Sequence, residues 1–89
     1  MDTKQITEEL GELDPEILLA DGFEAALIGY VTIYNKTLAL YDEAKCLDIL
    51  TQGGMSEDAA REYFDYNVVG AWMGEKTPAF ATIRRTLGD

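Results

Sequence analysis

The clearest pattern of hydrophobic and polar positions lies between Ser56 and Gly74. Seven mostly apolar residues recur there at spacings of three and one: Ala60, Tyr63, Phe64, Asn67, Val68, Ala71 and Trp72. This spacing places the side chains along one side of an α-helix. Ser56 fits the N-cap and Gly74 fits the C-terminal cap. The pattern therefore predicts a core-facing helix.

Two residues interrupt this stripe. A buried and unpaired Asn67 amide would cost about 1–3 kcal/mol. We therefore expect the Asn67 side chain to form a hydrogen bond with the backbone of a neighbouring loop, such as the Gly74–Pro78 turn. The alternative is that Asn67 contacts a ligand. Gly70 costs about 1 kcal/mol against alanine inside a helix, which a closely approaching backbone would explain.

Two further helices are predicted by their caps. Asp14-Pro15-Glu16 has an N-cap residue, a first-turn proline and an acid, and Gly22 would end that helix. Residues 1–9 are polar and are expected to be mobile. Asp42 caps the next helix, which has an apolar side formed by Cys46, Leu47, Ile49 and Leu50 and ends at Gly53-Gly54.

The remaining apolar stretches predict three strands. Residues 27–34 and 37–41 are rich in aromatic and β-branched side chains, and Asn35-Lys36 suits a hairpin turn between them. Residues 23–28 fit either the end of a helix or the start of this strand. A turn at 75–78 precedes a third strand over 79–83.

These elements predict one α+β domain over residues 1–89, in the order α-β-β-α-α-β. The hairpin and the C-terminal strand form a small three-stranded antiparallel sheet, packed on one face against two to three helices. Residues 84–89 are expected to form a tail.

Composition agrees with a folded domain outside the membrane. Hydrophobic residues make up 47% of the 89 residues, too many for a disordered acidic chain. No apolar core follows a basic start, and no uncharged run is long enough to span a bilayer. A single cysteine excludes an internal disulfide and favours a reducing compartment. We expect a cytoplasmic protein.

The net charge restricts the possible functions more than any other feature of the sequence. Seventeen acids oppose seven Lys and Arg, so the net charge is −10. This balance argues against direct contact with nucleic acid or an anionic membrane, and favours a basic partner surface.

The sequence offers little for catalysis. It has no histidine, so no Ser-His or Cys-His pair forms. Cys46 lies on an apolar helical side and is expected to be a buried, inert thiol. No zinc spacing, EF-hand loop or phosphate-binding glycine loop occurs. We expect no enzyme activity, metal or cofactor.

The candidate partner-binding residues are acids on the last long helix, opposite its apolar stripe: Glu57, Asp58, Glu62 and Asp65. A second group near the N-terminus comprises Glu8, Glu9 and Glu12. Acids four residues apart rise about 6 Å along a helix, comparable to the spacing of phosphates along a nucleic-acid strand. Such a face suits nucleic-acid mimicry, and a solubilising surface is the alternative interpretation.

The second half of the chain resembles a group of small proteins encoded by phages and prophages. The likeness covers residues 41–80 and is carried by Tyr41-Asp42, Cys46-Leu47-x-Ile49-Leu50, Gly54-Met55-Ser56-Glu57-x-Ala59 and Glu62-Tyr63-Phe64-x-Tyr66-Asn67-Val68-x-Gly70-Ala71-Trp72-x-Gly74-Glu75-x-Thr77-Pro78-x-Phe80. The group has no general assigned activity, so no catalytic residue is carried over. The resemblance implies a host-directed inhibitor, such as an anti-restriction or anti-CRISPR protein in the host cytoplasm.

The leading hypothesis is therefore a non-enzymatic acidic inhibitor that binds a basic, nucleic-acid-binding host protein. The alternative is a structural homo-oligomer, for example a homodimer, that uses the sheet face and Tyr30, Tyr34 and Tyr41.

Overall fold

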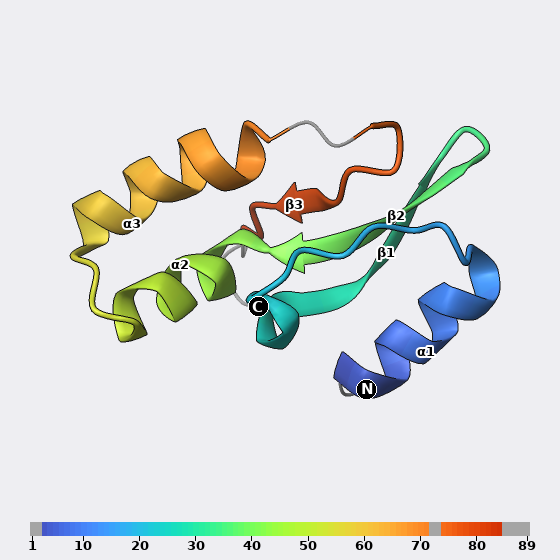
Figure 1. Ribbon diagram of the computed structural model, residues 1–89, viewed down its shortest axis with the longest axis horizontal. Coiled ribbons are helices and arrows are strands. Elements are labelled where there is room, and N and C mark those ends of the chain that lie inside the picture. Colours follow the sequence, from blue (N-terminus) through green and yellow to red (C-terminus); the bar gives the residue numbers. More distant parts are fainter. Residues whose placement is uncertain (1–2, 72–73, 85–89) are drawn as a thin grey trace.

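The computed structural model describes residues 3–71 and 74–84. Its elements follow in the order α1 (Thr3–Leu13), a 3₁₀ turn η1 (Glu24–Ala26), β1 (Leu27–Ile33), β2 (Lys36–Asp42), α2 (Glu43–Gln52), α3 (Glu57–Tyr63), a π-helical segment η2 (Phe64–Val69) and β3 (Ala79–Ala81). Figure 1 shows α1 at one end of the molecule and α3 at the other, with the sheet between them. The predicted α+β class and its element order are confirmed.

The sheet is mixed, which corrects the expectation of an antiparallel one. Strand order is β1-β2-β3, with β1 antiparallel and β3 parallel to β2. Leu40, Tyr41 and Asp42 pair with Ala79, Phe80 and Ala81. The chain reaches β3 through α2 and α3, and such a helical crossover returns the chain in the same direction.

The prediction that a helix begins at Asp14 is wrong. The carboxylate of Asp14 accepts the Glu16 amide at 3.0 Å, which forms a turn. The Asp14 carboxylate also accepts a hydrogen bond from the Lys76 ammonium. Residues 17–20 then run without helical structure. The first helix is instead α1, formed by the polar residues at the start of the chain, which buries Ile6 and Leu10 one turn apart.

The predicted N-caps of the later helices are confirmed, whereas the predicted C-terminal cap at Gly74 is wrong. Asp42 accepts the amides of Ala44 and Lys45, and Ser56 accepts the amide of Ala59. The predicted last helix changes at Phe64 into a π-helix that ends before Gly70. A Cβ on Gly70 would lie 3.0 and 3.1 Å from the carbonyl oxygens of Tyr66 and Asp65, so the crowding backbone belongs to this same segment.

The hairpin turns one residue earlier than predicted, at Tyr34-Asn35, because Ile33 pairs with Lys36. Tyr34 has a φ of 56° and is 97% exposed. The ambiguous stretch 23–28 contains both kinds of structure, namely η1 and then the first residues of β1. A bulge between Leu27 and Gly29 shifts the register there.

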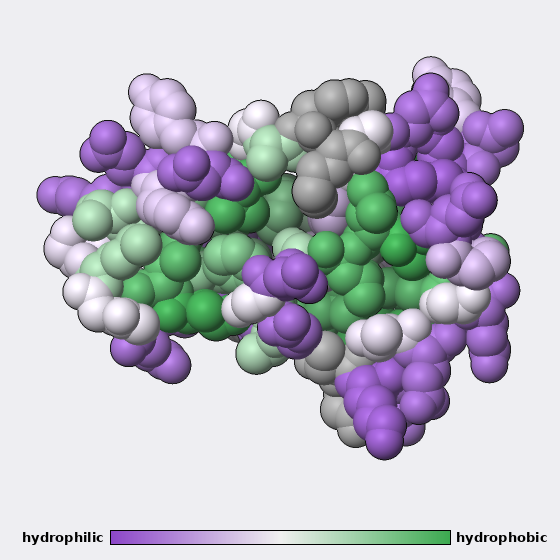
Figure 2. Space-filling view, in the orientation of Figure 1, coloured by the Kyte–Doolittle hydropathy of each residue, from purple (hydrophilic) through white to green (hydrophobic). Residues whose placement is uncertain are grey.

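One face of the sheet carries the core. The side chains of Ala39 and Tyr41 in β2 lie on that face, together with Phe80 of β3. The Phe80 ring stacks on the Tyr41 ring, with 5.5 Å between the ring centroids. Phe80 also meets Phe64 edge-on at 5.3 Å, which places the α3–η2 layer on this face. Figure 2 shows hydrophilic residues over α1 and around α3, with hydrophobic residues between these two ends.

Candidate binding site on helix α3

The first turns of α3 present three exposed acids. Glu57 and Asp58 follow the Ser56 cap, and Glu62 lies one turn after Asp58. Within residues 3–71 and 74–84, none of the three forms an ion pair. The buried side chains of Ala60 and Phe64 anchor the helix. The acids are therefore held outward on an ordered element.

Asp65 differs from the other three predicted acids, because it is partly neutralised. Arg61 contacts Asp65 at 3.5 Å and Glu43 of α2 at 3.0 Å. The hydrogen bond from Arg61 to Glu43, together with the negative charges of Glu43 and Asp65, raises the pKa of the Arg61 guanidinium. The ion pairs join α2 to α3, so we assign Asp65 a structural contact and keep Glu57, Asp58 and Glu62 as the acidic face of α3.

The second predicted group lies elsewhere. Glu8 and Glu12 are exposed on α1, whereas Glu9 is half-buried and accepts the Tyr30 hydroxyl at 3.4 Å. Helices α1 and α3 lie at opposite ends of the molecule (Figure 1). The structure therefore does not bring the two groups of acids into one surface, and only the acids of α3 are kept as candidate partner-binding residues.

The tyrosines proposed for a homo-oligomer are also separated. Tyr30 and Tyr34 are exposed, but Tyr41 is only 1% exposed. Its hydroxyl accepts the Ala20 amide at 2.8 Å, and burial raises the pKa of that hydroxyl. Tyr41 is a core residue and is removed from the proposed interface.

Reactive groups are sparse in the described part of the chain. Cys46 is fully buried, and burial raises the pKa of its thiol to about 12. A thiol with this pKa stays protonated and unreactive near neutral pH. No group of three or more Cys, Asp or Glu residues is placed to hold a metal ion in residues 3–71 and 74–84.

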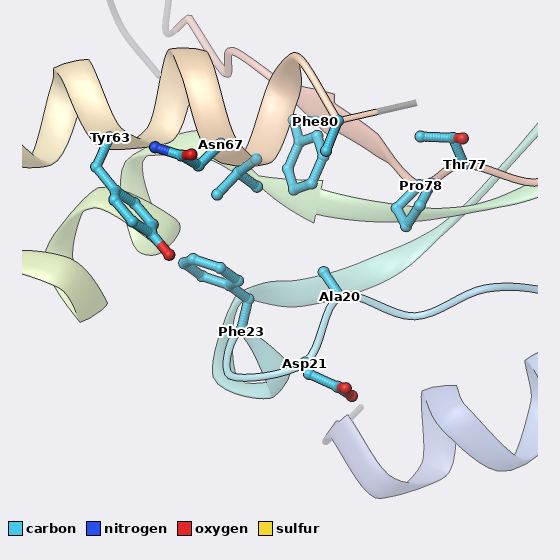
Figure 3. A pocket seen from close by; sticks show the side chains of 10 residues that line it. Ala20, Asp21, Phe23, Tyr63, Asn67, Thr77, Pro78 and Phe80 are labelled. Atoms are coloured by element: carbon cyan, nitrogen blue, oxygen red, sulfur yellow. The ribbon is translucent and has the colours of Figure 1, made fainter. Parts of the chain in front are cut away.

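Sequence reasoning missed a cavity beside α3 (Figure 3). The cavity has a volume of about 190 Å³ and lies between three segments that are far apart in the sequence. These segments contribute the lining residues Ala20, Asp21, Phe23, Tyr63, Asn67, Val68, Ala71, Thr77, Pro78 and Phe80. No local sequence signal marks such a cavity, since only the tertiary fold brings the segments together.

Asn67 lies at this cavity, which corrects its expected role. Its side chain is exposed, and among the described residues it forms no hydrogen bond with the 74–78 turn. Tyr63, expected in the core, is 42% exposed. Trp72 and most of the predicted tail at 84–89 lie outside the described residues.

The described helices are too short or too polar to cross a membrane. The chain matches no protein-family model, and comparison with curated proteins and with solved structures finds no match either.

Proposed function

We propose that this protein is a non-enzymatic binding protein that docks on a basic surface of a nucleic-acid-binding protein. The observation that carries the proposal is the acidic face of α3. Glu57, Asp58 and Glu62 project from a capped helix and have no cationic partner among the described residues. A fixed set of unpaired charges attracts and orients an oppositely charged partner.

The spacing of the acids supports mimicry of a nucleic-acid strand. Asp58 and Glu62 lie four residues apart, which corresponds to a rise of about 6 Å. Phosphates follow one another at about 3.4 Å of axis along a longer winding path. Acids at such intervals can occupy cationic sites that otherwise hold phosphates, and this would block nucleic-acid binding.

The resemblance to small phage proteins suggests where to look for the partner. Host nucleic-acid-binding proteins, including those of restriction and CRISPR defence, are the first class to test. The interaction is expected to weaken as salt rises, because screening acts most strongly on exposed charges.

The chain offers a charge-matched test of this proposal. The variant Asp58→Lys/Glu62→Lys reverses two acids of the α3 face, whereas Glu8→Lys/Glu12→Lys reverses two exposed acids of α1. Both variants change the net charge by the same amount and keep the spacing of four residues. Each variant and the wild type would be used as bait in bacterial lysates at low and high salt, with mass spectrometry of the eluted proteins.

We expect wild type and the α1 variant to retain the same nucleic-acid-binding protein at low salt, and the α3 variant to lose it. Retention of that protein by the α3 variant would contradict the proposal. Circular dichroism of both variants controls for loss of folding.

A homo-oligomer is a second candidate, favoured by the exposed hairpin. β1 lies at the sheet edge and contains no charged residue, and edge strands of this kind invite pairing with another chain. Ile33 is 46% exposed near the hairpin tip. Light scattering at high protein concentration tests this candidate, and a monomeric mass would remove it.

A further inference from the structure

The cavity beside α3 has the size of one side chain. Its volume is about 190 Å³. Sites for whole small molecules occupy about 300–1,000 Å³, whereas an apolar cavity of about 150 Å³ holds one benzene ring. The cavity therefore suits a single aromatic or large aliphatic group and is too small for a complete cofactor.

Most of its walls are apolar and are fixed by the core. Phe23 and Phe80 line the cavity, and both rings pack edge-on against the fully buried Phe64, with ring centroids 6.5 and 5.3 Å apart. The rest of the apolar lining comes from Ala20, Val68, Ala71 and Pro78. Because the walls are held by packing among themselves, the cavity does not need a ligand to form.

Two polar side chains lie on the α3 side of the cavity. The Asn67 amide is exposed and makes no side-chain hydrogen bond within the described chain, and Tyr63 lies one turn before it (Figure 3). An amide side chain can both donate and accept a hydrogen bond. Asn67 can therefore bond the N–H and C=O groups of a peptide backbone at the mouth of the cavity.

The surroundings of the cavity are acidic. Tyr63 and Asn67 also line an adjoining open hollow, together with Met55, Ala59, Glu62 and Tyr66. Of the described residues that line either depression, Asp21 and Glu62 are the charged ones, and no Lys or Arg is present. A ligand with positive charge beside its apolar group complements this surface.

We propose that the cavity receives an aromatic or large aliphatic side chain from a partner segment in which Lys or Arg flanks that side chain. The inference rests on the proposed function, because the same basic partner would supply the segment. A few anchor residues that fill desolvated pockets, most often aromatic side chains or Arg, supply most of the binding energy in protein interfaces. The acids of α3 would attract the partner, and the cavity would select the segment.

The direct test is an NMR titration of the full-length, isotope-labelled protein with three blocked tripeptides. The probe is acetyl-Lys-Phe-Lys-amide. Acetyl-Lys-Ala-Lys-amide removes the anchor and keeps the charge, and acetyl-Glu-Phe-Glu-amide keeps the anchor and reverses the charge. The resonances to follow are the Asn67 side-chain amide and the methyl groups of Val68, Ala20 and Ala71.

We expect the Lys-Phe-Lys peptide to shift these resonances saturably, with contacts from its ring protons to the Val68 methyl groups. Burial of the phenyl group should make it bind about tenfold or more tightly than the Lys-Ala-Lys peptide. The Glu-Phe-Glu peptide should bind more weakly than the Lys-Phe-Lys peptide, and this difference should shrink at high salt. Absence of saturable shifts, or equal binding of the Lys-Phe-Lys peptide and either control peptide, would overturn the inference.

A matched pair of variants adds a second test. In Asn67→Met, a longer apolar side chain replaces the amide at the cavity, and Val69→Met changes an exposed residue of the same segment that does not line it. Asn67→Met should abolish the shifts that the Lys-Phe-Lys peptide causes at the methyl groups of Val68, Ala20 and Ala71, and Val69→Met should retain them. Equal titrations of both variants would overturn the inference. The ring contacts in the wild type do not depend on how the variants fold.

These tests separate the inference from the proposed function. If the Lys-Phe-Lys peptide avoids the cavity while the charge-matched α1 and α3 baits still differ, the inference fails and the proposed function stands. If the α3 bait behaves as wild type, the proposed function fails whatever the peptides show.

Discussion

Helices α1 and α3 both carry several acids, but their surroundings differ. On α1, Glu9 contacts the Tyr30 hydroxyl, and Glu8 and Glu12 face solvent. On α3, Glu62 lines a hollow that shares Tyr63 and Asn67 with an apolar cavity. The acids of α1 and of α3 therefore do not form equivalent binding sites. Charge beside a preformed apolar recess offers both attraction and a specific anchor, whereas charge alone offers attraction and solubility.

The largest expected effect comes from removing the side chain that supports the α3 region. Phe64 is 0% exposed and packs against Phe23 and Phe80. Phe64→Ala should lower the free energy of unfolding by about 3–5 kcal/mol, through lost burial and the cavity left behind. Urea unfolding followed by circular dichroism measures this change. A loss below about 1 kcal/mol would show that the α3 region is not part of the core.

The Ser56 cap should have the next largest effect. Its hydroxyl accepts the Ala59 amide at 3.1 Å at the start of α3. Ser56→Ala should cost about 1 kcal/mol of stability, and Ser56→Asp should retain most of it. Equal stability of both variants in urea unfolding would mean that the cap does not hold the acidic face in place.

A pH-dependent contact links the end of α1 to the loop that lines the cavity. The hydrogen bond from Lys76 lowers the pKa of Asp14, and the same bond raises the pKa of Lys76. The Asp14 contribution is thus present above its unfolded pKa, near 3.8, and is lost as pH falls through its lowered folded pKa. The Lys76 contribution is present below 10.5 and is lost as pH rises through its raised folded pKa.

Asp14→Asn should therefore lower Tm at pH 7 and have a much smaller effect near pH 2. Glu12→Gln, at an exposed site on α1, is the control. Thermal melts across this pH range measure both variants. A Tm difference that stays constant with pH would show that the effect comes from something other than this ion pair.

The smallest effect is expected at Arg61. Arg61→Gln removes the cation that neutralises Asp65 and Glu43, which leaves two more unpaired acids near the α3 face. Affinity for a basic partner should rise a few-fold at low salt. Calorimetry with the partner protein recovered from the bacterial lysate measures this affinity. A fall in affinity would place Arg61 itself in the interface.

Local sequence signals predicted the elements whose structure is locally determined. The caps at Asp42 and Ser56 could be predicted because short-range hydrogen bonds define them. The hairpin strands could be predicted because side chains alternate between the two faces of a strand. Asp14-Pro15-Glu16 misled the prediction, since the same residues suit a helix start and a turn. The direction of β3 and the cavity depend on contacts between distant segments, and no local pattern encodes these.

The most direct test of the central claim is competition for the recovered partner. A fluorescent nucleic acid bound to that partner would be titrated with wild type and the two charge-matched variants at low salt. We expect wild type and Glu8→Lys/Glu12→Lys to displace it at similar concentrations, and Asp58→Lys/Glu62→Lys to need at least about tenfold more, a difference of about 1.4 kcal/mol. Equal displacement by all three proteins, or none by the wild type, would contradict the account.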